Sequence, residues 1–411
     1  MKNKHLSLFL MIFPILLSGF NQTSAQSYSW SQLNDFGGSV RFGVFTFVID
    51  NYGYMGGGYA NGVSVDDVWQ FNPTTNTWTQ KSDCPLPVRA CGNFAIDGIG
   101  YVVCGLMGGS TILDNVFAYD PVANTWIPKS DFPGVAIYGG ASFAIDGKGY
   151  YGVGNGGGAN GPYYTAFYEY TPTTDIWNQK AAFPGSPRYG CFGLAINDKG
   201  YVGFGGDDGP NLLYSDWYQY DPVTNLWMQK AFFPGAGRSY PCGFVLNNSG
   251  YIISGNSGAP VLDSDVYNYN PVANVWTVLP DFAGIARWAA NGFSIGDTGY
   301  VGTGSDGTNY LRDFWKYAPD SSTNLNELSQ MDEISIYPNP CLHILTLKSD
   351  NLSKFNNIEI LTIEGKSILL IQLNKRNLES YQIDLSSIKQ GVYFVKVNSG
   401  DRSVLKKFLK I

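Results

Sequence analysis

A repeat of about fifty residues places the strongest constraint on how this chain of 411 residues folds. Its most regular mark is a turn proline, which recurs at Pro73, Pro121, Pro172, Pro222, Pro271 and Pro319, at intervals of 48 to 51 residues. Aromatic residues stand two and four positions before each proline, a spacing that places both side chains on one face of a strand. A tryptophan stands five positions after each of the first five prolines. The repeat therefore predicts six copies of one module.

Each module contains signals for two hairpins. Asn-Pro and Asp-Pro turns precede the tryptophan, and sequences such as IDGKGY indicate an earlier hairpin, whose glycine we expect at the turn position with φ > 0. Four strands in each of six modules predict an all-β, six-bladed β-propeller, and the 50 Gly and 28 Tyr suit short strands and tight turns. The sixth module lacks its tryptophan, whereas Trp30 heads a matching segment near the other end. We expect residues 28–36 to complete the last blade.

The repeats resemble the kelch family. The resemblance rests on a Gly-rich stretch after the second strand, aromatic residues in the third, and Asn-x-Trp in the fourth, and it covers residues 28–319. It implies a six-bladed propeller over residues 26–319 whose common role is binding, with enzymes as a minority.

The remaining segments differ from the repeats in composition. Residues 1–25 have two early lysines, a short apolar run and small residues, which predicts a secretory signal peptide cleaved between Ala25 and Gln26. We expect no transmembrane span, because that run is too short and no other stretch is apolar enough. Residues 320–333 are interpreted as a linker. In residues 334–411, apolar and polar residues alternate between turn signals, which predicts a small β-sandwich.

The last segment also resembles the C-terminal sorting domain of the type IX secretion system of Bacteroidetes. The residues that carry the resemblance, and that we expect to form the sorting signal, are Tyr337, Pro338, Asn339, Pro340, Gly365, Gly391, Lys406 and Lys407. The resemblance implies that the type IX machinery is a partner. It also implies export through the periplasm, followed by secretion or retention at the cell surface.

Charge and histidine content exclude several functions. Residues 26–333 hold 13 Lys and Arg against 27 Asp and Glu, which argues against nucleic acid as a partner. The two histidines, His5 and His343, lie outside the propeller, which excludes a Ser-His-Asp triad or a His-ligated metal there. We expect no metal and no cofactor. The six cysteines form no CxxC pair, and both buried packing and disulfides remain open.

A binding site is expected where the repeat does not need its residues for packing. One face of the propeller should carry an arginine at the start of five blades: Arg41, Arg89, Arg188, Arg238 and Arg287. Such an arginine rim predicts a site for carboxylates, sulfate or acidic side chains. The alternative is that these arginines form salt bridges or bond to carbonyls within the scaffold.

Aromatic residues stand beside this rim, including one in the third blade, which has Ile137 in place of the arginine. They are Phe42, Tyr138, Tyr189, Tyr240 and Trp288, whose flat surfaces suit sugar rings or peptide. Our leading hypothesis is an exported binding module that recognises an extracellular glycan or protein at this face. An extracellular carbohydrate enzyme, such as a sialic acid mutarotase or epimerase, and a structural surface component are the alternatives. We identify no catalytic residue, and Glu169 is interpreted as structural.

Overall fold

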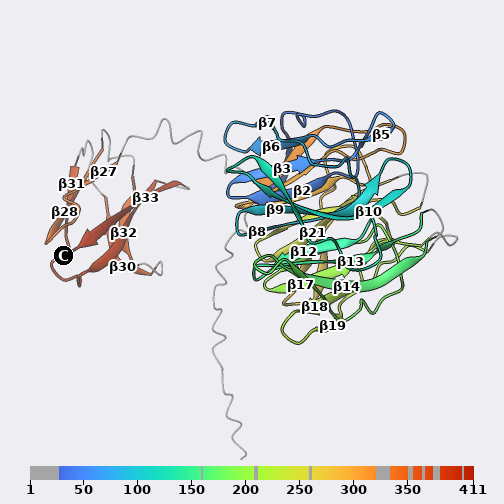
Figure 1. Ribbon diagram of the computed structural model, residues 1–411. Coiled ribbons are helices and arrows are strands. Elements are labelled where there is room, and N and C mark those ends of the chain that lie inside the picture. Colours follow the sequence, from blue (N-terminus) through green and yellow to red (C-terminus); the bar gives the residue numbers. More distant parts are fainter. Residues whose placement is uncertain are drawn as a thin grey trace, which may run out of the picture. The chain divides into compact units, whose positions relative to one another are not determined.

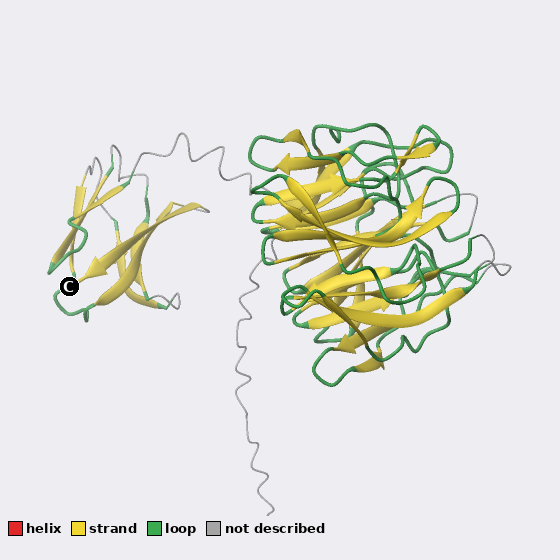
Figure 2. Ribbon diagram, viewed as in Figure 1, coloured by secondary structure: helices red, strands yellow, loops and turns green. Residues whose placement is uncertain are grey.

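The computed structural model describes residues 27–158, 161–207, 212–258, 262–320, 334–349, 355–362, 366–373, 380–399 and 402–411. Within these ranges the secondary structure consists of β-strands without a helix (Figure 2). The chain divides into two compact units, residues 1–320 and 321–411. The expected cleavage site at Ala25 and Gln26, the expected linker from residue 321 onward, and Gly365 lie outside the described residues.

Within the first unit, six four-stranded antiparallel sheets form the blades of a propeller (Figure 1). Blade 1 contains β2 (Phe45–Ile49), β3 (Tyr52–Gly56), β6 (Val68–Asn72) and β7 (Thr77–Lys81). A short hairpin of β4 (Tyr59–Ala60) and β5 (Val63–Ser64) lies between β3 and β6. Blade 2 contains β8 (Gly92–Ile96), β9 (Ile99–Met107), β10 (Thr111–Asp120) and β11 (Thr125–Lys129). Blade 3 contains β12 (Ala141–Ile145), β13 (Lys148–Asn155), β14 (Tyr163–Thr171) and β15 (Ile176–Gln179).

The second half of the propeller repeats this arrangement. Blade 4 contains β16 (Phe192–Ile196), β17 (Lys199–Gly203), β18 (Trp217–Asp221) and β19 (Leu226–Gln229). Blade 5 contains β20 (Cys242–Leu246), β21 (Ser249–Gly255), β22 (Asp263–Asn270) and β23 (Val275–Leu279). Blade 6 contains β24 (Asn291–Ile295), β25 (Thr298–Gly302), β26 (Phe314–Pro319) and, from the other end of the unit, β1 (Tyr28–Gln32). The first strands of neighbouring blades contact each other around a central channel.

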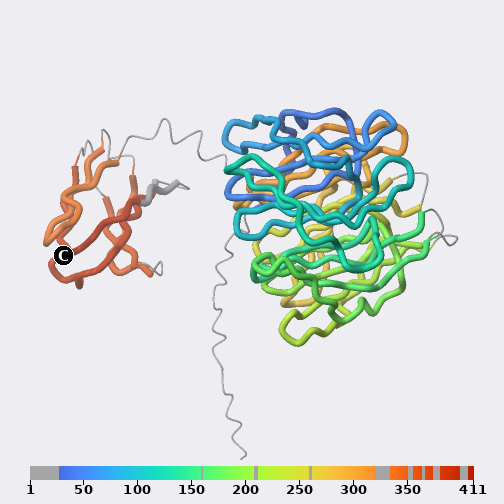
Figure 3. Tube along the Cα trace, in the orientation of Figure 1, coloured from blue at the N-terminus to red at the C-terminus, as the bar shows by residue number. Residues whose placement is uncertain are grey.

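The N-terminal strand closes the ring by completing blade 6. β1 pairs antiparallel with β26, with Trp30 opposite Tyr317, and Figure 3 shows the blue start of the propeller trace beside its orange end. The Trp30 ring packs on Phe282 and Tyr317, with ring centroids 4.8 and 4.9 Å apart. β1 thereby covers an edge that β26 would otherwise expose.

Neighbouring blades interlock through a phenylalanine and a glycine. The glycine shared by all six early hairpins lies within the second strand, so our expectation that it occupies the turn position with φ > 0 was wrong. In blade 3 that conformation falls on Asp146 and Gly147, with φ of 49° and 71°. In five blades the shared glycine instead makes room for a phenylalanine ring of the preceding blade, and a Cβ on Gly149 would lie 2.2 Å from the Phe94 ring. In blade 5 the corresponding Gly250 faces Ile196 and Leu194.

All six cysteines are buried and unpaired in the described structure. Burial raises the pKa of the Cys191 and Cys242 thiols to about 12, so both remain protonated at neutral pH. The sequence left two roles open for the cysteines. In the described structure they are small packing residues and form no disulfide.

The second unit is a β-sandwich. One sheet contains β27 (Ser335–Tyr337), β28 (Ile344–Lys348) and β31 (Ser380–Asp384). The other contains β30 (Ser367–Gln372), β29 (Asn357–Leu361), β32 (Gly391–Ser399) and β33 (Arg402–Lys410). Apolar residues of both sheets, among them Leu345 and Ile358, form one buried core.

Closure by β1 predicts that Trp30→Ala destabilises the propeller. Truncation removes the ring that packs on Phe282 and Tyr317, and we expect a loss of about 3 kcal/mol in the free energy of unfolding. Ser31→Ala, at an exposed position of the same strand, is the control and should change little. Urea unfolding followed by tryptophan fluorescence measures both. Equal stability of the two variants would contradict closure through Trp30.

The interlocking of blades predicts that a single methyl group at Gly149 is harmful. We expect Gly149→Ala to lower the free energy of unfolding by about 2 kcal/mol, because the Phe94 ring has to move away from the new Cβ. Gly109→Ala provides the matched control, since a Cβ there meets no atom within 4 Å. Thermal unfolding of both variants tests this, and a Gly149→Ala melt like that of the control would contradict the packing role.

Candidate binding site at the channel mouth

Four of the five arginines expected at the rim lie buried inside their blades, and we call them staple arginines because each links several segments of its blade. Arg41, Arg188, Arg238 and Arg287 are each at most 1% exposed, and each forms a two-bond ion pair with an aspartate. The pairs are Arg41–Asp67, Arg188–Asp216, Arg238–Asp265 and Arg287–Asp313. In blade 6, Arg287 Nη1 lies 2.7 Å from Asp313 Oδ1 and Nη2 lies 2.6 Å from Oδ2. These four side chains therefore do not offer free guanidinium groups to a ligand.

The staples also bind backbone carbonyls. In the same blade, Arg287 Nη1 donates to the Thr303 carbonyl and Nε donates to the Ile285 carbonyl. The guanidinium thus joins the entry to the first strand, the end of the second and the start of the third. At these four positions the arginines therefore stabilise the scaffold, which was the alternative to a ligand site.

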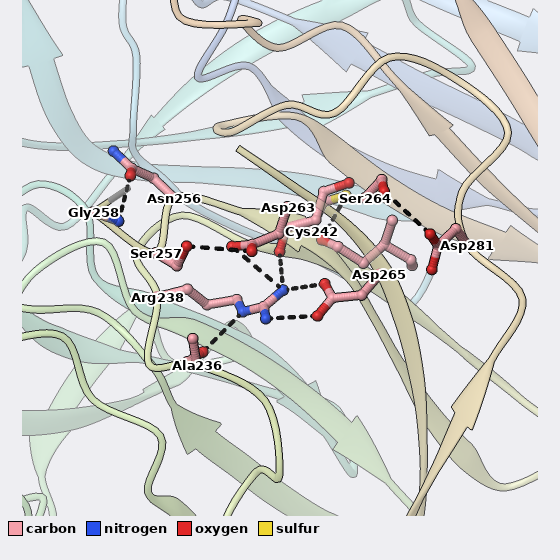
Figure 4. A network of polar contacts seen from close by, with 12 residues as sticks. Ala236, Arg238, Cys242, Asn256, Ser257, Gly258, Asp263, Ser264, Asp265 and Asp281 are labelled. Carbon is pink, nitrogen blue, oxygen red and sulfur yellow. Dashed lines mark hydrogen bonds and ion pairs between the residues drawn. The ribbon is translucent and has the colours of Figure 1, made fainter. Parts of the chain in front are cut away.

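Blade 5 adds a second carboxylate to its staple. Figure 4 shows Arg238 between Asp265 and Asp263, with Asp263 Oδ2 3.8 Å from Arg238 Nη1. Burial raises the pKa of Asp263. Arg238, which lies farther from Asp263 than from Asp265, and the hydrogen bond from Ser257 lower the pKa by less than burial raises it.

Arg89 differs from the other four arginines because the segment that leads into the first strand of blade 2 is one residue shorter than in the other blades. Ten residues separate Cys84 from Phe94, whereas eleven separate the equivalent pair in every other blade, such as Phe36 and Phe47. The Val88 carbonyl accepts a backbone N–H from the preceding blade, as the Arg41 carbonyl does, so Val88 occupies the staple position. Arg89 takes the next position.

That next position carries an aromatic residue in four blades. In each blade the residue at this position forms an isolated β-bridge on the same side of the propeller. The six residues are Phe42, Arg89, Tyr138, Tyr189, Ser239 and Trp288. The residue after Ser239 is Tyr240, which supplies the aromatic ring for blade 5. The arginine and the aromatic residues expected beside it therefore form one ring of positions, which we call the mouth.

The mouth encloses a cavity of about 250 Å³. Its lining comprises Phe42, Gly43, Arg89, Ala90, Leu106, Tyr138, Tyr189, Tyr240, Trp288 and Ala289. The rings contact each other in sequence, with Tyr240 5.9 Å from Tyr189 and 5.6 Å from Trp288, and Phe42 5.3 Å from Trp288 between centroids. The Arg89 guanidinium carbon lies 4.1 Å from the centroid of the Tyr59 ring.

A closed ring of backbone hydrogen bonds forms the floor of the mouth. Six residues with φ between 48° and 68° each donate their N–H to the carbonyl of the equivalent residue in the preceding blade, at 2.7 to 3.1 Å. They are Gly43, Ala90, Gly139, Gly190, Tyr240 and Ala289. Below them lies a channel cavity of about 480 Å³, lined by the first strands and by small polar residues such as Asn93 and Ser142.

Tyr240 separates the two cavities. It lines both, and its ring lies over blades 3 and 4, where a Cβ on Gly139 or Gly190 would approach it to 2.8 Å. Burial and the neighbouring Tyr189 raise the pKa of Tyr240 well above its usual value, so the phenol stays protonated.

Glu169 belongs to a buried ion cluster outside the mouth. Its carboxylate accepts from Lys148 Nζ and Tyr150 Oη at 2.8 Å each, and Lys180 Nζ lies 3.2 Å away. Burial acts to raise the pKa of Glu169, but these partners outweigh it and lower the pKa. These contacts agree with the structural interpretation of Glu169.

In the second unit, the expected sorting residues lie around the last strand. Asn339 accepts from the Leu409 N–H at 2.9 Å and donates to the Lys407 carbonyl at 3.2 Å, so the Tyr337–Pro340 segment holds β33. Lys406 and Lys407 are exposed on β33, and Gly391 begins the neighbouring β32. The role of these residues as a sorting signal stays a prediction.

Comparisons with known families and structures agree with both units. Residues 335–411 match the secretion system C-terminal sorting domain, and residues 56–85 match the Kelch motif. The Kelch match lies within the propeller and the sorting-domain match spans the second unit, and together they support a kelch-type propeller followed by a type IX secretion sorting domain. The sorting domain indicates type IX secretion to the cell surface or the extracellular space, and hence handling by the secretion machinery.

The propeller has a counterpart among solved structures. The structure titled "Structure of YjhT" aligns with a TM-score of 0.60 and 16% identity, over 71% of this chain and 98% of that one. At this identity the likeness shows the fold alone. A comparison with curated proteins gave no match. No helix among the described residues is long and apolar enough to cross a membrane.

Two features of the mouth were not predicted from the sequence. Tyr59, under Arg89, comes from the small β4–β5 hairpin, and no repeat position marks it. The second feature is that Arg89 does not form a staple, and the sequence contains two signals for this. The Cys84–Phe94 interval is one residue shorter than in the other blades, and Asn115 stands in place of the aspartate that pairs with a staple arginine.

The arginine staples predict a loss of stability in acid. Burial acts to raise the pKa of Asp67 and Asp313, but hydrogen bonds from Arg41 and Arg287 outweigh it and lower both pKa values. A lowered folded-state pKa contributes stability that is fully present above the unfolded-state pKa of about 3.9. That contribution is lost as the pH falls through the folded-state value. We therefore expect the urea midpoint to fall between pH 6 and pH 3.

Asp313→Asn tests the origin of this dependence. Removing the charge leaves Arg287 buried without its counter-ion, and we expect about 3 kcal/mol of destabilisation at pH 6 with a smaller further loss at pH 3. Asp297→Asn, in an exposed turn of the same blade, should behave like the wild type. An unchanged pH dependence in Asp313→Asn would contradict the assignment.

Proposed function

We propose that this protein is an exported binding module that recognises the end of an extracellular glycan in the mouth of its propeller. The observation that carries the proposal is the cavity of about 250 Å³ lined by Phe42, Tyr138, Tyr189, Tyr240 and Trp288. Aromatic faces of this kind pack on the apolar faces of sugar rings, and the phenol hydroxyls supply polar contacts at the edge. The sorting domain delivers the propeller to the compartment where glycans are accessible.

The size of the cavity favours a glycan end over a protein surface. A stable protein partner covers about 800 Å² on each side, whereas the aromatic lining is confined to one small concave site. The cavity is also smaller than the roughly 300 to 1,000 Å³ of sites for drug-sized ligands, which suits a single sugar ring.

The chemistry of the lining favours binding over catalysis. None of the described residues that line the mouth cavity carries a carboxylate, and the raised pKa of Tyr240 makes its phenol a poor base at neutral pH. The carboxylates of Asp67 and Asp313 are held in ion pairs with Arg41 and Arg287.

Trp288→Ala tests the proposed site. Trp288 contacts both Phe42 and Tyr240, so its loss removes a wall of the cavity, and we expect glycan affinity to fall by at least about tenfold. The measurement is a glycan array with the full-length protein, followed by titration calorimetry on the best ligand.

Phe232→Ala is the matched control. Phe232 is 58% exposed and lies outside the mouth cavity, so its removal should leave binding unchanged. Thermal unfolding of both variants separates binding from folding. Equal losses in the two variants, or no glycan bound by the wild type, would overturn the proposal.

A further inference from the structure

We infer that Arg89 is an anion subsite of the mouth and that the glycan end it selects is a hexuronic acid, a sugar ring that carries one carboxylate. The inference rests on the proposed function, because it concerns the ligand of the same cavity. It adds the charge of the ligand and the residue that reads it.

The guanidinium of Arg89 contains a buried nitrogen that lacks a hydrogen-bond partner. Its Nη1 atom is buried and has no hydrogen-bond partner in the described structure. The staple arginines in four other blades each pair with an aspartate, and Arg312, on the segment leading into β26, pairs with Asp35. A buried donor without a partner keeps the full cost of its removal from water, and this cost is larger for a charged group. An anion that enters the mouth removes this cost.

Blade 2 does not use the Arg89 side chain to link its strands. Val88 fills the staple position of blade 2 and is 2% exposed, and Asn115 stands where the other stapled blades have aspartate. The blade therefore holds together without a charge pair at this point. Arg89 instead lies against Tyr59 and lines the cavity, where its charge meets any ligand.

The position of Arg89 beside the aromatic rings fits a sugar that carries a carboxylate. A guanidinium binds a carboxylate through two parallel N–H···O bonds, and stacking on Tyr59 fixes the plane of the fork. In a hexuronic acid the carboxylate is attached directly to the pyranose ring. One ring can therefore contact the aromatic wall and the arginine within a cavity of about 250 Å³.

The experiment compares one ligand in two charge states. Titration calorimetry of the full-length protein uses an oligosaccharide with a terminal hexuronic acid and the same oligosaccharide after reduction of the carboxyl to an alcohol. We expect the acid to bind at least about tenfold more tightly than the neutral sugar. Arg89→Gln should remove this difference, so that the acid and the neutral sugar bind the variant with affinities within about twofold of each other.

Two further variants sharpen the result. Arg312→Gln, at an exposed arginine outside the mouth cavity, should keep the full preference for the acid. Arg89→Lys keeps the charge but loses the fork, so part of the preference should remain. If Arg89→Gln fails to fold, the wild-type comparison and Arg89→Lys still decide.

Equal binding of acid and neutral sugar by the wild type would overturn this inference and leave the proposed function standing. The absence of binding to either sugar, and to every glycan on the array, would overturn both. Tighter binding of a sulfated sugar, of a larger nine-carbon acidic sugar or of an acidic peptide would also overturn the hexuronic acid in favour of that class.

Discussion

Six backbone hydrogen bonds that pass from blade to blade are the constraint on which the rest of the propeller depends. They close only when six equivalent residues adopt the left-handed conformation and when the sixth blade meets the first. β1 makes the second condition possible by completing blade 6. The closed ring then places the side chain of Tyr240, and those of the residues just before the other five, around one small opening, so the binding cavity is a direct product of ring closure.

Most of the fold was predictable because its determinants repeat. The turn prolines, the strand aromatics and the displaced Trp30 segment each occur at fixed spacing, and the all-β propeller predicted from them is confirmed. The C-terminal sandwich, predicted from the alternation of apolar and polar residues after residue 333, is confirmed as well. The role of the shared glycine was not predictable from one hairpin. Gly149 is constrained by Phe94, which lies about fifty residues away in another blade, and only the assembled structure brings the two together.

The site was predictable only in part, for an electrostatic reason. An arginine that recurs in five blades signals either a rim or a staple, and its partner decides between them. The partner aspartates lie 25 to 30 residues downstream, among many acidic turn residues, and nothing in their immediate surroundings marks them. The aromatic positions were easier to place, because the residue next to the repeated arginine is set by the same spacing.

The single shortened segment in blade 2 gives the mouth a direction. A ring of six similar blades would by itself accept a ligand equally well in six rotational positions about the channel axis. One guanidinium at one position, opposite a wall of uncharged rings, leaves a single orientation in which charge and aromatic contact coincide. The loss of one residue thus turns a nearly symmetric opening into a site that distinguishes the two ends of its ligand.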